Sequence, residues 1–119
     1  MIQAACHCGT VRLEVSRAPR TLLDCNCSIC RRIGGLWAYY RSQSVRLRYR
    51  KRDVETYSWG ERSIRYVRCR RCGCVMHHER TRNPRGSTLG VNVRNFDPLA
   101  IAKARVRRFD GAKTWKYLD

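Results

Sequence analysis

Eight cysteines in a chain of 119 residues fall into three tight clusters, and this bunching constrains the fold more than any other feature. Three of them, Cys25, Cys27 and Cys30, lie within six residues of one another. Thiols this close in sequence converge on a common centre only if something holds them, and a metal ion is the natural holder. Zinc prefers four ligands, so three thiolates leave a fourth position for water or a substrate atom. The pattern predicts an open, reactive zinc site.

Two further clusters flank this one in the sequence. A Cys-x-Cys-Gly segment begins at Cys6, and a Cys-x-x-Cys-Gly segment begins at Cys69. In each segment, the glycine lets the chain turn tightly around an ion. Together the segments predict a closed, structural zinc site whose four ligands are Cys6, Cys8, Cys69 and Cys72. Cys74 exceeds what the two sites need; we expect it to be a spectator or a small core residue, and its replacing one of the ligands is the alternative.

A disulfide framework is the alternative interpretation, because the number of cysteines is even and small domains are often stapled by disulfides. Residues 1–5 show no basic region followed by an apolar run, so nothing directs the chain to an oxidising compartment, and we expect a cytoplasmic protein. The cysteines are also bunched at spacings of two and three positions, whereas disulfides usually join distant positions. Both observations favour metal binding.

Four segments carry a resemblance that runs in order over nearly the whole chain. They are the run from Cys6 to Val15, the run from Asp24 to Gly34, Cys69-x-x-Cys72-Gly73, and the run from Val91 to Asp97 with Asn92 and Arg94. They resemble the glutathione-dependent formaldehyde-activating enzyme family, which shares a domain with centromere protein V. The resemblance implies a β-tent fold, a structural zinc on the first and third clusters, a catalytic zinc on the middle one, and carbon–sulfur lyase chemistry that joins glutathione and formaldehyde. Asn92, Arg94 and Asp97 are the weaker candidates of the late motif.

Alternation of apolar and charged residues predicts a mainly β protein. Val11, Leu13 and Val15 alternate with charged residues, which is typical of a half-buried strand. Similar patterns predict extended segments at 11–15, 36–40, 45–49, 54–59, 63–68, 75–79, 89–94 and 104–107. Only short helical turns are expected, one of them capped by Ser28 and ended by Gly34. We therefore expect one zinc-stabilised domain over residues 1–119, built of small antiparallel sheets.

The charge of the middle cluster indicates which substrate its metal would bind. Three thiolates bring Zn²⁺ to a net charge of about −1, which makes it a weaker Lewis acid than the neutral three-histidine sites that activate water. A thiol starts from a pKa near 8.5 and loses its proton outright on binding zinc. The site is therefore suited to a thiol that attacks a small aldehyde, and the family resemblance implies that this thiol is glutathione.

The chain carries a formal net charge of +17, and all but four of its 26 basic residues are arginines. Such a surface attracts anionic partners. Arg31 and Arg32 directly follow the middle cluster and are candidates to bind the carboxylates of glutathione, although they are also ordinary surface arginines in this composition. No apolar stretch is long enough for a membrane span.

Two functions from different classes remain open at this point. The first is a zinc-dependent carbon–sulfur lyase that acts on small thiol and aldehyde substrates. The second is a zinc-stabilised basic module that binds nucleic acid or another polyanion. His77 and His78 lie on a predicted strand with opposed faces, and the sequence does not single out either as the general acid of an enzyme.

Overall fold

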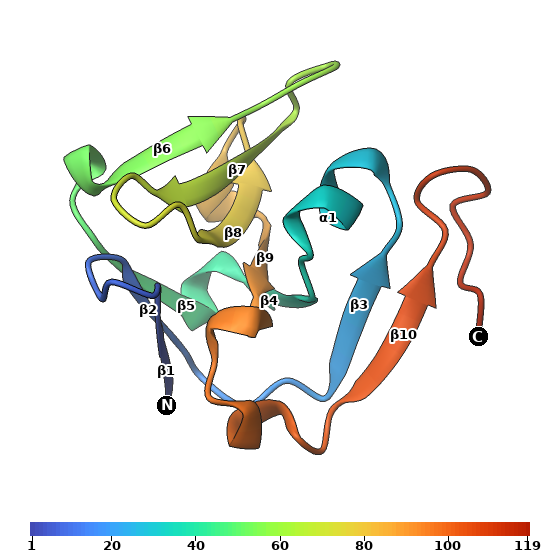
Figure 1. The fold of residues 1–119 in the computed structure, drawn as a ribbon, viewed down its shortest axis with the longest axis horizontal. Helices are drawn as coiled ribbons and strands as arrows, with labels where there is room; N and C mark the ends of the chain where they lie inside the picture. The colour runs from blue at the N-terminus through green and yellow to red at the C-terminus, as the bar shows by residue number, and fades with distance from the viewer.

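Two β-sheets share one hydrophobic core in this protein, as seen in a computed structural model that describes residues 1–119 (Figure 1). The smaller sheet has the strand order β1-β2-β5, and the larger has the order β10-β3-β4-β9-β8-β7-β6. Neighbouring strands run antiparallel except for β3 and β10, which are parallel. The predicted mainly β architecture is confirmed.

The elements follow one another with short connections. The ten strands are β1 (Ile2–Ala5), β2 (Arg12–Val15), β3 (Thr21–Cys25), β4 (Trp37–Arg41), β5 (Val45–Arg48), β6 (Val54–Tyr57), β7 (Ile64–Cys69), β8 (Val75–Arg80), β9 (Thr88–Asn92) and β10 (Arg105–Phe109). The single α-helix is α1 (Ser28–Ile33), and 3₁₀ turns lie at Ser42–Ser44, Lys51–Asp53, Pro84–Gly86, Val93–Asn95 and Pro98–Ile101. No helix is both long enough and apolar enough to cross a lipid bilayer.

Each of the eight predicted extended segments contains a strand, with ends displaced by a few residues. Two strands, β1 and β3, were not expected. The helix prediction is correct in extent but wrong in its cap, because the side chain of Cys27 rather than Ser28 accepts from the Cys30 N–H. Gly34 ends the helix in the left-handed conformation, with φ of 71°, as a glycine does most easily.

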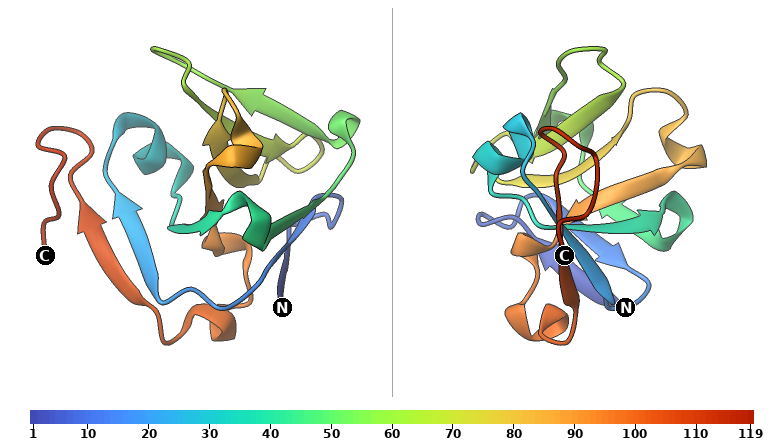
Figure 2. Two further views of the ribbon diagram at one scale, coloured as in Figure 1. Left: turned by 180° about the vertical axis from the view of Figure 1, so that it is seen from behind. Right: turned by 90° about the vertical axis from the view of Figure 1, so that its right-hand side faces the viewer.

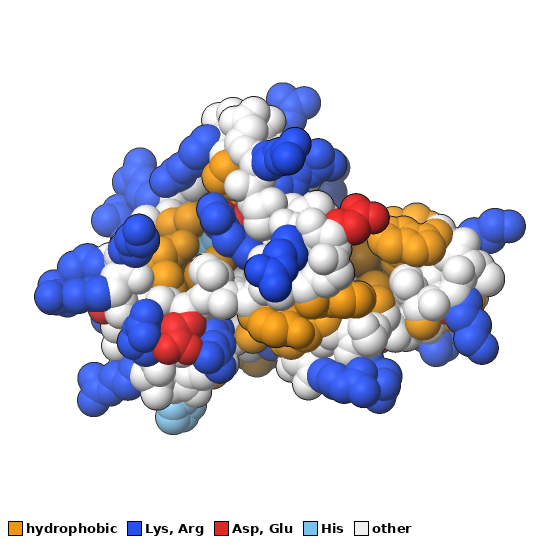
Figure 3. Space-filling view, turned by 90° about the horizontal axis from the view of Figure 1, so that it is seen from above, with side chains coloured by type: hydrophobic (Ala, Val, Ile, Leu, Met, Phe, Trp, Pro, Cys, Tyr) orange, Lys and Arg blue, Asp and Glu red, His pale blue; other side chains and the backbone are white.

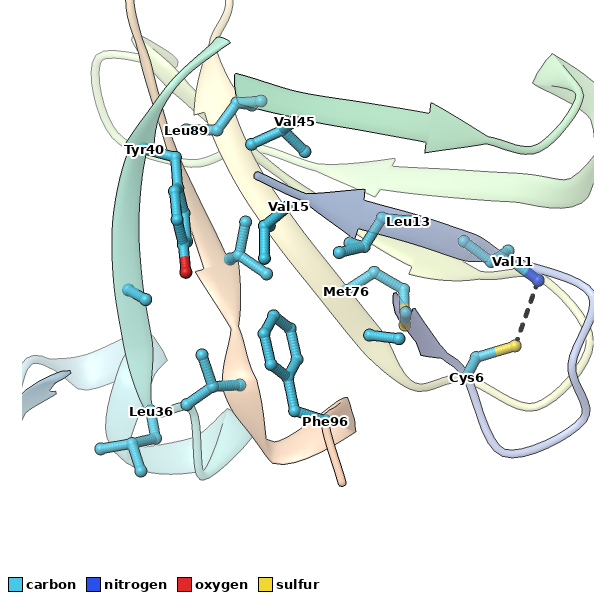
Figure 4. Packing of buried hydrophobic residues seen from close by; sticks show 14 of the residues in the cluster. Cys6, Val11, Leu13, Val15, Leu36, Tyr40, Val45, Met76, Leu89 and Phe96 are labelled. Atoms are coloured by element: carbon cyan, nitrogen blue, oxygen red, sulfur yellow. Dashed lines mark hydrogen bonds between the residues drawn. The ribbon is translucent and has the colours of Figure 1, made fainter. Parts of the chain in front are cut away.

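The core lies between the two sheets, where apolar side chains from both meet (Figure 4). Leu13 and Val15 from β2 face Met76 from β8, and Phe96 lies beside them. Because the side-chain period of a strand is two, each sheet presents one apolar face to this layer. Burial of each such side chain stabilises the fold by about 1.5–3 kcal/mol.

The larger sheet splays open beside the middle cysteine cluster. β3 pairs with β4 only at Leu23 and Trp37, so the β3–β10 pair diverges from the rest of the sheet. α1 lies in the resulting gap between β3 and β8, and the views from front and back agree on this (Figures 1 and 2). The opening places the cysteine loop above one face of the sheet.

Strand register decides which side chains share that face. Tyr39 of β4 is opposite Gly90 of β9, and Gly90 is in turn opposite His78 of β8. His78 is opposite Tyr66 of β7. Because directly paired residues point to the same side of a sheet, Tyr39, His78 and Tyr66 all project from the face that the cysteine loop overhangs.

Candidate metal centres and substrate cavity

The four cysteines of the predicted closed site meet in space. The sulfur atoms of Cys6, Cys8, Cys69 and Cys72 all lie within 4.8 Å of one another. The Cys6–Cys8 separation is 3.7 Å and the Cys8–Cys69 separation is 3.6 Å. Two thiolates at tetrahedral positions on a zinc ion, with bonds of about 2.3 Å, lie about 3.8 Å apart. The cluster therefore has the dimensions of a four-thiolate zinc site.

Two tight turns build this cluster. The chain reverses between β1 and β2 at Gly9, with φ of 82°, and after β7 at Gly73, with φ of 80°. Both values lie in the left-handed region, which glycine enters without steric cost. Within the turns, backbone N–H groups donate to sulfur, from Val11 to Cys6 at 3.3 Å and from Cys72 to Cys69 at 3.4 Å. Such bonds favour the thiolate form that a metal requires.

The sulfur atoms of Cys25, Cys27 and Cys30 also lie within 4.8 Å of one another, and no fourth His, Cys, Asp or Glu joins them at that range. Cys25 ends β3, Cys27 caps α1 and Cys30 lies within α1. The turn of the helix is what brings Cys27 and Cys30 to one side. These three residues could hold a zinc ion with one position left open.

The surroundings of the three thiols fit a metal-bound thiolate. The N–H groups of Cys27 and Cys30 donate to Cys25 and Cys27, each at 3.5 Å. Trp37 is fully buried, and its indole Nε1 has no hydrogen-bond partner at normal distance. Burial raises the pKa of the Cys30 thiol, and the indole of Trp37 acts in the opposite direction by favouring its ionised form. A thiolate at Cys30 is the acceptor that this N–H needs.

The three thiols differ in acidity. Burial raises the pKa of Cys25 and of Cys30 above the ordinary thiol value. At Cys27, burial acts in the same direction but is outweighed by hydrogen bonds, above all from the Cys30 N–H, and the pKa falls. A cation at the centre would bring all three to the thiolate form, since a coordinating thiol is deprotonated outright.

A cavity of about 700 Å³ opens beside the three cysteines. Eleven of its nineteen lining residues are hydrophobic. His78 and Tyr39 lie in its wall, with the Tyr39 hydroxyl 3.4 Å from His78 Nε2. Burial lowers the pKa of His78 to about 4 and raises that of Tyr39, so both are neutral near pH 7. His77, the residue before His78, is fully buried, and the Tyr49 hydroxyl lies 3.0 Å from its Nε2. His77 and His78 therefore point to opposite faces of β8, as the sequence predicted.

Arg31 and Arg32 are exposed on α1, and neither is among the residues that line the cysteine cavity. The Arg32 guanidinium donates to the carbonyl of Ser28 at 2.8 Å, within its own helix. Cations at the end of a helix interact favourably with its terminal carbonyls. The structure therefore gives Arg32 a local bond within α1 and places neither arginine among the residues that line the cysteine cavity.

A second cavity, of about 590 Å³, adjoins the first, and Tyr39 and Thr88 line both. Three arginines, Arg17, Arg20 and Arg41, line this basic groove, and no carboxylate does. None of the three takes part in an ion pair. The groove is therefore a concentrated and uncompensated positive region next to the cysteine cavity. Sequence patterns do not reveal it, because Arg17 and Arg20 lie in the connection from β2 to β3 whereas Arg41 ends β4.

The late-motif residues support the site from behind. The Asn92 side chain accepts from the N–H groups of Leu36 and Arg94, at 3.3 and 3.2 Å, and donates to the Val75 carbonyl at 2.9 Å. The Arg94 guanidinium donates to the carbonyl of Gly34. Asp97 caps a 3₁₀ turn through the N–H of Leu99. The bonds to Leu36 and Gly34 hold the segment that joins α1 to β4, just before Trp37 at the start of β4.

Hydrogen bonds join the loop that carries Cys25 and Cys27 to the C-terminal turn, and the sequence did not predict them. Asn26, which lies between two of the thiols, donates to Asp110 at 3.0 Å and accepts from the Ala112 N–H at 3.0 Å. Asp110 also accepts from Thr114. The Cβ of a residue replacing Gly111 would lie 2.6 Å from the Cys25 sulfur. The C-terminal turn is thus packed directly against the open cluster.

Comparison with known proteins agrees with this geometry. A solved structure of a Rhodobacter sphaeroides protein is similar, with a TM-score of 0.71 and 31% sequence identity over 88% of this chain and 99% of that one. Residues 1–110 match the family described as glutathione-dependent formaldehyde-activating enzyme. That match spans both cysteine clusters and the late motif. The chain therefore belongs to the glutathione-dependent formaldehyde-activating enzyme family.

Proposed function

We propose that this protein is a zinc-dependent carbon–sulfur lyase that joins a thiol, glutathione, to an aldehyde and catalyses the reverse cleavage. The observation that carries the proposal is the meeting of three thiols, Cys25, Cys27 and Cys30, with no fourth ligand, at the wall of a cavity of about 700 Å³. Membership of an enzyme family named for glutathione and formaldehyde supports it. A second zinc ion, bound by the closed cluster, would be structural.

Zinc bound at the open cluster would supply acidity to a thiol at its fourth position. The chain's own residues prepare the surroundings. The buried indole N–H of Trp37, which has no other partner, favours the thiolate form of Cys30. Eleven of the nineteen lining residues are hydrophobic, and such a lining lowers the polarity around a bound thiol, which strengthens electrostatic interactions there. These features favour attack by a thiolate over attack by water.

Addition of a thiolate to an aldehyde leaves negative charge on the former carbonyl oxygen. The hydroxyl of Tyr39 lies in the cavity wall, and burial keeps its pKa above the ordinary value, so it holds its proton. Neutral His78, with its proton on Nε2, donates to the oxygen of this hydroxyl at 3.4 Å and leaves the hydroxyl proton free to be donated. We assign Tyr39 as the hydrogen-bond donor to the oxygen, with His78 as its positioning residue.

Glutathione carries two carboxylates, and the basic groove is suited to bind them. Arg17, Arg20 and Arg41 line it without competing carboxylates, and Tyr39 and Thr88 join it to the cysteine cavity. A thiol in the cysteine cavity can therefore extend its anionic end into the groove. Arginine binds carboxylates through paired hydrogen bonds, which are stronger than neutral ones.

Titration of cobalt-substituted protein with glutathione tests this proposal. We expect glutathione to change the charge-transfer absorption of Co²⁺ at the open site, because sulfur replaces an oxygen ligand. Cys27→Ser should abolish the change, and Cys74→Ser, which alters a cysteine outside both clusters, should retain it. If glutathione leaves the Co²⁺ absorption unchanged, and tight nucleic-acid binding survives Cys27→Ser, the polyanion-binding module is the better description. Contacts made only to phosphates should weaken by about 0.9 log unit each per tenfold rise in salt.

A further inference from the structure

The cavity beside the open cluster is much larger than a one-carbon aldehyde requires. Its volume of about 700 Å³ falls in the range of sites that bury drug-sized ligands. The carboxylates of a thiol such as glutathione have a separate place in the basic groove, which has a further volume of about 590 Å³. Unfilled volume therefore remains in the cysteine cavity around the aldehyde carbon that the thiol sulfur would attack.

The walls of this cavity are mostly apolar and come from separate parts of the chain. Trp59 belongs to the β6–β7 hairpin loop, Ile64 and Tyr66 to β7, Phe109 to β10, and Trp115 to the C-terminal turn. Three of the nineteen lining residues are charged, Glu61, Glu79 and Arg80, and Arg80 is the one Lys or Arg among them, although the chain has 26. Because eleven of the nineteen lining residues are hydrophobic and the carboxylates outnumber the cations, the lining favours an apolar occupant over an anionic one.

Several of these side chains are partly uncovered at the mouth of the cavity. Trp59 is 49% exposed, Ile64 is 39% exposed and Trp115 is 74% exposed. Seen from above, hydrophobic side chains gather around a hollow in a surface otherwise rich in lysine and arginine (Figure 3). Large apolar groups that gather at a mouth in this way are typical of ligand-binding surfaces.

The placement of Trp115 is enforced by its backbone. This residue has φ of 58°, in the left-handed region, which bulky side chains rarely adopt. Its N–H donates to the Asp110 carbonyl at 2.8 Å, and its ring packs edge-on against Phe109 at 5.4 Å. Asp110 is itself bonded to Asn26, between two of the thiols. The loop that holds the open cluster therefore also holds an aromatic wall over it, at the expense of backbone strain.

We propose that this chain accepts an aldehyde with a bulky apolar substituent, aliphatic or aromatic, in preference to formaldehyde. The inference rests on the proposed lyase function and names its electrophile. The thiol sulfur forms a bond to the aldehyde carbon, the carbonyl π pair moves to the oxygen, and the oxygen takes one proton while the thiol loses one. The product contains all the atoms of both reactants, and no oxidation occurs. The substituent lies against Trp59, Ile64 and Trp115.

The first test compares aldehydes in the zinc-loaded full chain with glutathione. Adduct formation and cleavage are followed by NMR exchange with the uncatalysed rate subtracted. We expect kcat/KM for phenylacetaldehyde and isovaleraldehyde to exceed that for formaldehyde by about tenfold or more, since each well-packed methylene can contribute about tenfold. Trp59→Ala should reduce this preference about tenfold. Tyr57→Ala removes an aromatic of similar exposure that lines neither cavity, and it should leave the preference unchanged.

The second test measures binding without turnover. By calorimetry, S-benzylglutathione should bind the zinc-loaded protein about tenfold more tightly than S-methylglutathione, and Trp59→Ala should remove the difference. Equal affinities, together with equal or faster turnover of formaldehyde, would overturn this inference and leave the lyase proposal standing. A clear benzyl preference with no acceleration of any aldehyde would overturn the lyase proposal while supporting the apolar specificity of the cavity.

Discussion

The sulfur atoms of Cys8 and Cys69 lie 3.6 Å apart, although 61 positions separate the two residues in the chain. Cys8 follows the first strand of the smaller sheet, and Cys69 ends β7 of the larger sheet. A metal ion at this point would tie the two sheets together and close a long loop. The binding energy of a structural zinc ion is then part of the folding energy.

The two clusters should therefore respond differently to serine substitution. Cys69→Ser removes a fully buried ligand of the closed cluster and should unfold the protein or leave it insoluble, because zinc at such sites contributes on the order of 10 kcal/mol. Cys27→Ser should leave a folded domain with about one zinc ion. Elemental analysis and urea unfolding measure both effects. Equal losses of stability in the two variants would contradict the division into closed and open sites.

Arginines of the basic groove should control the affinity for glutathione. Arg41→Ala or Arg17→Ala should weaken binding about tenfold or more, because each hydrogen bond between charged groups contributes about 1.5–3 kcal/mol. Arg46→Ala, on the exposed side of β5, is the matched control for the loss of one positive charge. Calorimetry on zinc-loaded protein measures the difference. A loss of affinity in Arg31→Ala or Arg32→Ala, with none in Arg41→Ala, would instead place the carboxylates at α1.

Gly35→Ala should disturb the open cluster through Trp37. An added Cβ would lie 2.5 Å from Cζ2 of the indole and 3.0 Å from its Nε1, and the fully buried ring has little room to yield. We expect a loss of about 1–3 kcal/mol in the free energy of unfolding and weaker metal binding at the open cluster.

Gly34→Ala provides the comparison for this variant. Its Cβ would meet nothing within 4 Å, so its effect comes only from a φ of 71° and should be about 1 kcal/mol. Denaturant unfolding and competition with a chelating dye measure stability and metal affinity. Equal metal affinities in the two alanine variants would show that Trp37 does not steady the Cys30 thiolate.

Stability should decline in mild acid because of His77. Burial, assisted by the nearby Arg65, lowers the pKa of His77 from 6.5 to about 4. Between these values the unfolded chain binds a proton that the folded chain does not, so the contribution is complete above pH 6.5 and is lost as the pH falls toward 4. The full difference corresponds to about 3 kcal/mol.

His77→Gln keeps a hydrogen-bonding group for Tyr49 and should flatten this pH dependence. Urea unfolding at several pH values, with bound metal measured at each, separates the effect from release of zinc. An unchanged slope in His77→Gln would assign the acid sensitivity to the cysteine clusters instead.

Local spacing predicted much of the cysteine chemistry. Cys25, Cys27 and Cys30 can reach one point through a single helical turn, and the glycines after Cys8 and Cys72 allow the reversals that the closed cluster needs. Strand alternation likewise predicted the opposed faces of His77 and His78. These features depend on a few consecutive bonds, so the sequence around them is sufficient.

The substrate cavity could not be predicted in this way. Tyr39, His78 and Tyr66 share a face only because β4, β9, β8 and β7 pair in one register. The parallel pairing of β3 with β10 and the bond from Asn26 to Asp110 bring the C-terminal turn over the thiols. Arg31 and Arg32 are adjacent to the cluster in sequence but do not line the cavity, whereas Arg41 lines the neighbouring groove.

The sequence by itself indicated which cysteines cluster, the positions of most strands and the family of this protein. Tertiary structure alone decided the apolar wall of Trp59 and Trp115, the basic groove and the partners of Tyr39. The reason is that ligand spacing is set by local backbone geometry, whereas the walls of a cavity are set by long-range strand pairing. A shift of one residue in that pairing would turn each side chain to the opposite face.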